Sequence, residues 1–388
     1  MTAPVVAVVG GGQLARMMAP AATALGVHLR VLVESPTSSA AQVVVDAPVG
    51  SASDEAAITR LADGADALTF EHEHVPNALL DRLEAAGVAV HPDAAALVHA
   101  QDKIVMRTRL AALGVPVPAW AALSNAADLA AFLAEHDGVA VVKTSRGGYD
   151  GKGVRVVRAA GEVEDWFAAV ADGTGVPLLA EEKVPFTREL AVLVARRPSG
   201  EIRTWPVVES VQRDGVCAEV VAPAPGLDPS TRAEALDVAT RIAAGLGVTG
   251  VLAVELFEVA DSAGGPPRVL VNELAMRPHN SGHWTIDGAV TSQFEQHLRA
   301  VLDLPLGDTS ARAPWTVMAN VLGSALPDPT DALADVATLD AGAKVHLYGK
   351  EVRAGRKLGH VNVSGDDLDD VRRRAVAAAA VLRGDASA

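Results

Sequence analysis

The sequence predicts an α/β protein that divides into three domains. Three observations support this prediction: the chain has 388 residues, strand and helix patterns alternate near the N-terminus, and strand patterns dominate farther on. A single core seldom extends beyond about 250–300 residues, so more than one domain is expected. We expect a parallel α/β domain over residues 1–100, a two-lobed α+β domain over 101–311 and a small β-rich domain over 312–388.

The first hundred residues alternate between apolar runs and helical patterns. A strand over Val5–Val9 leads through three glycines into a helix over Gln13–Leu25, and a second strand is expected at 29–33. Because strands joined by helices form parallel sheets, this segment predicts a Rossmann-like domain. Its further elements are expected at 67–70 (strand), 76–86 (helix) and 88–90 (strand).

The glycine turn of this domain also matches a dinucleotide-binding fingerprint. Gly10, Gly12 and Ala15 have the required spacing, and Glu34 follows the second strand. The helix N-terminus after the turn could hold an anion, but the fingerprint does not define which anion. An NAD-linked oxidoreductase is therefore one alternative for function.

The composition argues against several kinds of partner. The net charge of −15 disfavours nucleic acid, whose phosphates bind positive surfaces. The single cysteine, Cys217, excludes an intrachain disulfide and fits a reducing compartment. The N-terminus lacks the pattern of a secretory signal, and the apolar segment at 375–382 is too short to cross a bilayer. We expect a cytoplasmic protein that binds neither nucleic acid nor membrane.

A glycine-rich loop in the central domain has the character of a phosphate-binding lid. An apolar strand at 139–142 leads to Lys143 and to a loop in which four of seven residues are glycine, and a strand pattern follows at Val154–Val157. Backbone amides, with Lys143 and the loop's own Lys152, form a donor surface suited to a polyphosphate. The loop does not match the Walker A motif. Because a strand pattern lies on each side of it, we expect a hairpin that closes over a nucleotide. The alternative is a flexible hairpin tip with no ligand. The glycines are Gly147, Gly148, Gly151 and Gly153.

Two acidic residues are expected to face each other in a hairpin of the same domain. Strand patterns at 251–259 and 268–274 are separated by a turn-rich segment. With the turn centred on Gly264, Glu255 and Glu273 lie opposite each other, where two like charges destabilise a sheet unless something offsets them. Mg²⁺ would offset them, because one or two carboxylates plus substrate phosphates commonly hold this ion. The alternative is a pair of surface carboxylates.

A second group of metal-type residues follows the third strand. His72 and His74 alternate with Glu71 and Glu73. Alternation places the two histidines on one face and the two glutamates on the other, so four ligands do not converge. We expect no metal site there.

The remaining polar segments lie at the ends of predicted elements. A donor-rich loop spans 276–284, and such loops commonly carry sites. A basic segment at 350–357 could be a solvated patch, or it could bind a substrate phosphate. Other elements are expected at 102–113, 161–171, 228–246, 292–302 and 366–382 as helices and at 177–180, 189–196 and 316–322 as strands.

Four long motifs resemble one branch of the ATP-grasp superfamily. They are GGGQLARM at 10–17, GGYDGKG at 147–153, HNSGHWT at 279–285 and KEVRAGRKLGH at 350–360. The match extends over essentially the whole chain and is similar to the 5-(carboxyamino)imidazole ribonucleotide synthases of purine biosynthesis. It implies the ATP-grasp architecture and the ATP-dependent carboxylation of 5-aminoimidazole ribonucleotide by bicarbonate through carboxyphosphate. Met276 departs from the family, which usually has proline at this position.

The resemblance also implies roles for individual residues. Lys103 and Lys143 would contact the phosphates of ATP under the glycine loop, Glu255 and Glu273 would hold Mg²⁺ or Mn²⁺, and Arg277 would stabilise the intermediate. Residues expected to bind the rest of the nucleotide are Glu181, Glu182, Lys183, Val184, Glu189, Gln212 and Asn272. Those expected to bind the aminoimidazole substrate are Gln13, Leu14, Glu71, Glu73, Arg277, His279, Lys350 and Arg356, with Tyr149, Asp150 and Lys152 brought to it by the closing loop. A homodimer is also implied, and another ATP-grasp ligase is the nearer alternative for function.

Overall fold

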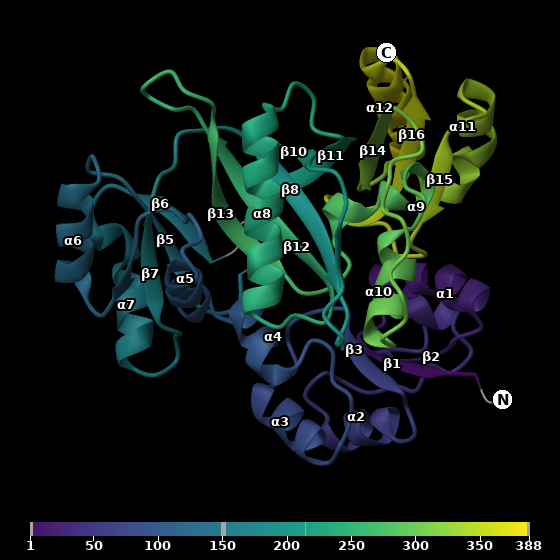
Figure 1. The fold of residues 1–388 in the computed structure, drawn as a ribbon, viewed down its shortest axis with the longest axis horizontal. Coiled ribbons are helices and arrows are strands. Elements are labelled where there is room, and N and C mark those ends of the chain that lie inside the picture. Colours follow the sequence, from purple (N-terminus) through teal and green to yellow (C-terminus); the bar gives the residue numbers. More distant parts are fainter. Residues whose placement is uncertain (1–2, 149–152, 214, 386–388) are drawn as a thin grey trace.

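The computed structural model describes residues 3–148, 153–213 and 215–385, and these residues form three sheets with helices packed around them (Figure 1). The large sheet occupies the centre of Figure 1, with the N-terminal sheet below it and a smaller lobe to its left. In the described part of the chain, no helix has both the length and the apolar character needed to span a membrane.

The N-terminal sheet is parallel, as the alternating pattern predicts. β1 (Val5–Val9) lies between β2 (His28–Leu32) and β3 (Ala67–Phe70), and α1 (Gln13–Leu25) connects the first two. The strand predicted at 88–90 is wrong, because Val90 forms only an isolated bridge to Leu68 and Pro92 follows without an N–H to continue a ladder. The other helices of this region are α2 (Glu55–Ala62), α3 (Asn77–Ala85) and α4 (Ala94–Gln101).

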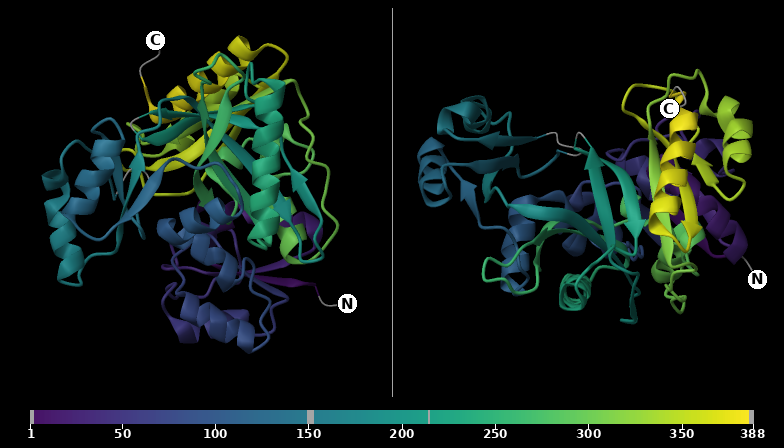
Figure 2. Two further views of the ribbon diagram at one scale, coloured as in Figure 1. Left: turned by 60° about the vertical axis from the view of Figure 1, so that its left-hand side comes forward. Right: turned by 90° about the horizontal axis from the view of Figure 1, so that it is seen from above.

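A four-stranded antiparallel sheet forms the small lobe of the central domain (Figure 2). β5 (Ala140–Thr144) and β6 (Val154–Val157) form the hairpin that carries the glycine loop, which confirms that the loop joins two strands. β7 (Leu178–Glu182) pairs with the other edge of β5, and β4 (Trp120–Leu123) completes the order β4-β7-β5-β6. The helices that pack on this sheet are α6 (Ala126–Glu135) and α7 (Glu164–Ala171).

The large sheet has the order β13-β12-β8-β10-β11-β14-β16-β15, with β9 beside β8. β11 pairs with β14, so the C-terminal strands continue the sheet of the central domain instead of forming a sheet of their own. The strands are β8 (Phe186–Arg196), β9 (Ile202–Thr204), β10 (Val208–Arg213), β11 (Val216–Ala222), β12 (Gly250–Val259), β13 (Arg268–Ala275), β14 (Trp315–Leu322), β15 (Lys344–Leu347) and β16 (Lys357–Gly365).

Helices cover this sheet at three places. α8 (Pro229–Gly245) packs on β8 and β13, and α12 (Leu368–Arg383) packs on β14 and β16. α10 (Gln293–Val301) contacts both β12 and α1, so it connects the large sheet to the N-terminal domain. The remaining α-helices of the described residues are α5 (Lys103–Ala112), α9 (Thr285–Gly288) and α11 (Leu333–Leu339).

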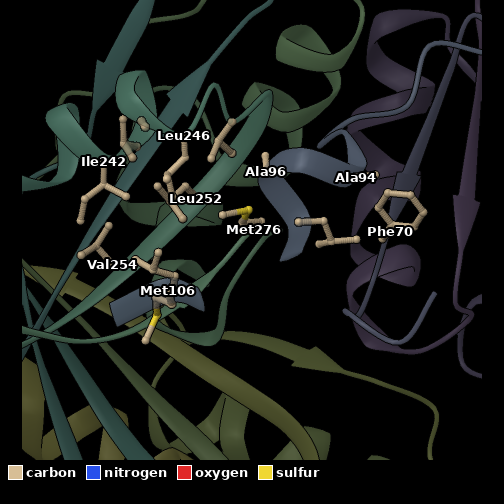
Figure 3. Packing of buried hydrophobic residues seen from close by; sticks show 14 of the residues in the cluster. Phe70, Ala94, Ala96, Met106, Ile242, Leu246, Leu252, Val254 and Met276 are labelled. Carbon is tan, nitrogen blue, oxygen red and sulfur yellow. The ribbon is translucent and has the colours of Figure 1, made fainter. Parts of the chain in front are cut away.

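One hydrophobic cluster extends from the N-terminal domain into the central domain (Figure 3). Phe70 of β3 and Ala96 of α4 belong to the same cluster as Leu252 and Val254 of β12. Met276 lies in this cluster and is 2% exposed, so the departure from the family's usual proline is accommodated as core packing. The donor-rich loop that follows is thereby anchored at its first residue.

Candidate active site

The two glutamates of the β12–β13 hairpin face each other, as the sequence predicts. Glu255 pairs directly with Glu273 in the antiparallel ladder. The register shifts between Glu255 and Leu256, which leaves Asn272 as an extra residue on β13. Because a bulge re-aims side chains and commonly occurs beside active sites, it determines how Asn272 and Glu273 are presented.

A lysine and a histidine lie against this carboxylate pair. Lys103 Nζ is 3.5 Å from Glu273 Oε1, and His279 Nε2 is 3.2 Å from Glu255 Oε1. Asp102 caps α5 by accepting two of its backbone amides, as the preference for aspartate at this position leads one to expect. The cap places Lys103 in the first turn of the helix, beside the hairpin.

The electrostatics of the pair favour a bound cation. Desolvation and then the charge of Glu255 raise the pKa of Glu273, although two lysines oppose this. Desolvation also acts on Glu255, but the hydrogen bond and charge of His279 and the charge of Arg277 lower its pKa. Among the described residues, no three His, Cys, Asp or Glu side chains converge to hold a metal. Mg²⁺ is commonly held by one or two carboxylates, with phosphate and water oxygens as its other ligands. The two carboxylates of the hairpin therefore fit this ion.

The glycine loop begins beside Lys103. Lys103 Nζ donates to the carbonyl of Gly147 at 3.2 Å. Gly147, Gly148 and Gly153 have φ values of 67°, 78° and 67°, a region that favours glycine. Four residues predicted for this site lie outside the described residues, and their roles stay predictions: Tyr149, Asp150, Gly151 and Lys152.

Lys143 is held by a buried carboxylate. Lys143 Nζ lies 2.7 Å from Glu181 Oε2, and the other carboxylate oxygen accepts from Arg107 at 2.7 Å. The resemblance implies that Glu181 binds adenine. Both of its carboxylate oxygens are already paired with these two cations. Its backbone groups are therefore the ones that could bind the adenine base. Arg107 is a residue that the sequence analysis missed, because an arginine inside a helical pattern usually faces solvent.

An apolar surface lies beside residues 181–184. Val184 packs with Leu270, and Phe257 is partly buried against them. Phe257 also stacks on Phe186, with ring centroids 4.6 Å apart. Such a surface suits the face of a purine base, and it supports the prediction that residues 181–184 frame adenine.

Glu189 and Gln212 lie on adjacent strands, β8 and β10. Burial and the charge of Glu255 raise the pKa of Glu189 to about 7, while a hydrogen bond from Gln212 lowers it. The two side chains therefore form a polar group next to the carboxylate pair. Their predicted role in binding the nucleotide is compatible with this position.

Glu189→Gln is expected to flatten the pH dependence of the stability of the ligand-free protein. The pKa of Glu189 is about 7 in the folded protein, against an ordinary value of 4.5. The folded protein therefore binds more protons between these values, and the stability contributed by this group is lost as the pH rises through about 7. Thermal melts at about pH 5 and about pH 8 should show a larger loss for the wild type than for the variant. Equal losses would contradict the raised pKa.

Glu71 occupies the anion position of the N-terminal fingerprint. Its carboxylate accepts the backbone amides of Gly12 and Leu14 at the start of α1. A dinucleotide pyrophosphate would have to bind these same amides. The arrangement therefore disfavours the NAD-linked alternative.

Three of the residues predicted to bind the second substrate, Gln13, Glu71 and Arg356, lie around Lys350. Its Nζ donates to Gln13 Oε1. The pKa of Lys350 is lowered to about 8, chiefly by burial. The charge of Glu71 raises this pKa and the charge of Arg356 lowers it, so Glu71 and Arg356 are both close enough to interact with Lys350. Two other predicted residues pair with each other: Arg277 belongs to the loop after β13, and its Nε lies 2.9 Å from Glu73 Oε1.

A buried glutamine that the sequence analysis missed holds His279 in place. Gln293 Oε1 accepts from the backbone amide of His279, and Gln293 Nε2 donates to its carbonyl, both at 2.8 Å. Gln293 is fully buried at the start of α10. A polar residue at the start of a helix usually indicates only a helix terminus, so this contact could not be predicted from the pattern.

Fold and site together define an ATP-grasp protein. The family model of the ATP-grasp domain matches residues 108–294. The ribonucleotide synthetase preATP-grasp domain matches residues 3–101, and the phosphoribosylaminoimidazole carboxylase C-terminal domain matches residues 316–374. The chain is 56% identical over 380 residues to the N5-carboxyaminoimidazole ribonucleotide synthase of Mycobacterium tuberculosis, covering 97% of this chain and 87% of the relative. The chain belongs to the N5-carboxyaminoimidazole ribonucleotide synthase family, as its four motifs predict.

Other relatives agree with this membership. The synthase of Corynebacterium ammoniagenes is 54% identical over 384 residues, with 98% of this chain and 92% of the relative covered. The solved structure of the Aspergillus clavatus synthase in complex with ADP and 5-aminoimidazole ribonucleotide has a TM-score of 0.86 at 31% identity, covering 98% of this chain and 99% of the other. The Thermus thermophilus synthetase has a TM-score of 0.85 at 39% identity, covering 97% and 98%.

Proposed function

We propose that this chain uses ATP and bicarbonate to carboxylate the exocyclic amine of 5-aminoimidazole ribonucleotide, a step of purine biosynthesis. The observation that carries the proposal is the loop after β13, which contacts both halves of the site. His279 pairs with Glu255 of the hairpin, and Arg277 pairs with Glu73 of the N-terminal domain. A nucleotide bound at the hairpin and an amine bound at the N-terminal domain would therefore meet at this loop.

The chemistry requires two transfers. Bicarbonate is a poor electrophile, and transfer of the γ-phosphoryl group of ATP to one of its oxygens gives carboxyphosphate and ADP. The amine then forms a bond to the carboxyl carbon, the bond from that carbon to the phosphate oxygen breaks, and phosphate and a proton leave. Phosphoryl transfer depends mainly on positioning and on charge stabilisation, which Lys103, Lys143 and Arg277 would supply.

The remaining residues have roles in binding. Glu255 and Glu273 would hold Mg²⁺, or Mn²⁺ in its place, which when bound neutralises phosphate charge. The rest of the nucleotide would be bound by the glycine loop and by Glu181, Glu182, Lys183, Val184, Glu189, Gln212 and Asn272. The aminoimidazole ribonucleotide would be bound by Gln13, Leu14, Glu71, Glu73, His279, Lys350 and Arg356, with Lys350 and Arg356 at its phosphate.

An assay of phosphate release tests this function. With ATP, Mg²⁺ and bicarbonate present, we expect 5-aminoimidazole ribonucleotide to stimulate phosphate release, because the amine consumes the activated carboxyl group. Omission of bicarbonate should remove the stimulation. Stimulation by a different amine, and none by this ribonucleotide, would instead support another ATP-grasp ligase and overturn the substrate assignment.

We further propose that the protein acts as a homodimer in the cytoplasm. The division into domains at about residues 100 and 311 stays a prediction, and it is close to the bounds matched by the three family models, 3–101, 108–294 and 316–374. Sedimentation of the purified protein would test the dimer.

A further inference from the structure

A buried arginine on α5 contacts both lobes of the nucleotide site. Arg107 is fully buried, and its guanidinium group has three partners. Nε donates to Glu181 of β7 at 2.7 Å. The two terminal nitrogens donate to the carbonyls of Val271 and Asn272 on β13, at 2.8 Å and 2.7 Å. One side chain thus joins the small sheet to the large sheet, and no described strand pairing connects these two sheets.

In the small lobe, Glu181 connects Arg107 to Lys143. Glu181 is 3% exposed, and its second oxygen lies 2.7 Å from Lys143 Nζ. Desolvation opposes ionisation of Glu181, but the charges of Arg107 and Lys143 hold its pKa below the usual range. A buried carboxylate with two cationic partners has a fixed position, so it restrains the flexible stem of Lys143.

The large-sheet end of the link lies next to Glu273. In the described sheet β13 is an edge strand, and the outer groups of an edge strand have no strand partner. Arg107 binds the carbonyls of Val271 and Asn272, where the bulge interrupts the ladder just before Glu273. The same guanidinium group therefore restrains the strand segment that carries Glu273.

We infer that Arg107 is a positioning residue for the metal–nucleotide complex. It fixes Lys143 of the small lobe relative to Glu273 of the large sheet, so that the lysine and the carboxylate act on the same phosphates. The inference rests on the proposed function and deepens it. Lysine could not replace Arg107, because its point charge cannot satisfy three acceptors arranged around a planar fork.

The test compares Arg107→Lys with Arg109→Lys in the full chain. Arg109 lies on the same helix and donates to the carbonyl of Gly245, outside the site. Calorimetry measures the binding of 5-aminoimidazole ribonucleotide and of the Mg²⁺ complex of a non-hydrolysable ATP analogue. We expect Arg107→Lys to weaken binding of the analogue about tenfold, the loss expected for charge-assisted hydrogen bonds. Binding of the ribonucleotide should not change, and Arg109→Lys should behave as the wild type.

The outcomes separate this inference from its alternatives. Binding of the analogue by Arg107→Lys within about twofold of the wild type would overturn it. Equal weakening of both ligands would show that Arg107 only stabilises the fold. If Arg107→Lys does not fold, Glu181→Gln tests the same contact. Its amide keeps the shape of the carboxylate but offers only one acceptor oxygen to the two cations. Unchanged binding of the analogue by this variant would also overturn the inference. Failure of the wild type to bind the analogue would instead contradict the proposed function.

Discussion

Glu273→Gln is expected to lower turnover by at least about 100-fold, which corresponds to about 2.7 kcal/mol of transition-state stabilisation. The variant removes one carboxylate ligand of the proposed Mg²⁺ site. The fold should persist, because Glu273 faces Glu255 and a neutral side chain relieves their repulsion in the ligand-free protein. Kinetics over a Mg²⁺ titration measure the loss, and a thermal melt should show stability no lower than that of the wild type.

Two further variants test whether the loss of turnover comes from the metal site. Glu255→Gln should act in the same direction with a smaller loss, since the charge of His279 already offsets part of the charge of Glu255. Glu295→Gln is a matched control, because its carboxylate pairs with Arg299 on the same helix at 2.7 Å, outside the site. Wild-type activity of Glu273→Gln at saturating Mg²⁺ would remove Glu273 from the metal site.

Arg356→Ala is expected to raise the KM for 5-aminoimidazole ribonucleotide by about tenfold or more, the loss of a charge-assisted contact worth about 1.5–3 kcal/mol. Arg356 lies within electrostatic reach of Lys350, and it donates one hydrogen bond to the carbonyl of Glu351 at 3.1 Å. Its planar fork has further donors for a substrate phosphate. Steady-state kinetics with each substrate varied in turn should show little change in the KM for ATP.

Arg353→Ala is the matched control for this prediction. Arg353 belongs to the same basic segment, but its side chain is 67% exposed and pairs with Glu351 at 2.6 Å. We expect this exposed pair to contribute little, so both KM values should stay at the wild-type level. Equal weakening of both substrates in Arg356→Ala would show that the basic segment supports the fold and does not bind the ribonucleotide.

The carboxylate pair could be predicted from the sequence, although the bulge that completes it could not. A turn centred on Gly264 predicts that Glu255 faces Glu273, and this pairing is confirmed. Nearer the turn, however, Val259 pairs with Arg268, one residue away from that register. The extra residue at Asn272 restores the predicted pairing. Period-two alternation defines faces but does not locate such an insertion.

Polar contacts between distant segments could not be predicted from the sequence. Arg107 and Gln293 both lie in helical patterns, and neither pattern indicates that the side chain binds a backbone carbonyl in a distant segment. The same limit applies to the pairing of β11 with β14, because the pattern of a strand defines its buried face and not its neighbour. The motifs could be recognised because their residues are close in sequence, whereas these contacts depend on tertiary packing.

The most direct test of the account follows the atoms of bicarbonate labelled with heavy carbon and heavy oxygen. The wild type, given ATP, Mg²⁺ and 5-aminoimidazole ribonucleotide, should place one labelled carbon in the carboxyamino product for each ADP formed. The released phosphate should carry one labelled oxygen, because the carbon–oxygen bond of carboxyphosphate breaks when the amine attacks. ATP hydrolysis that leaves the ribonucleotide unlabelled, or phosphate without the heavy oxygen, would contradict carboxylation through carboxyphosphate.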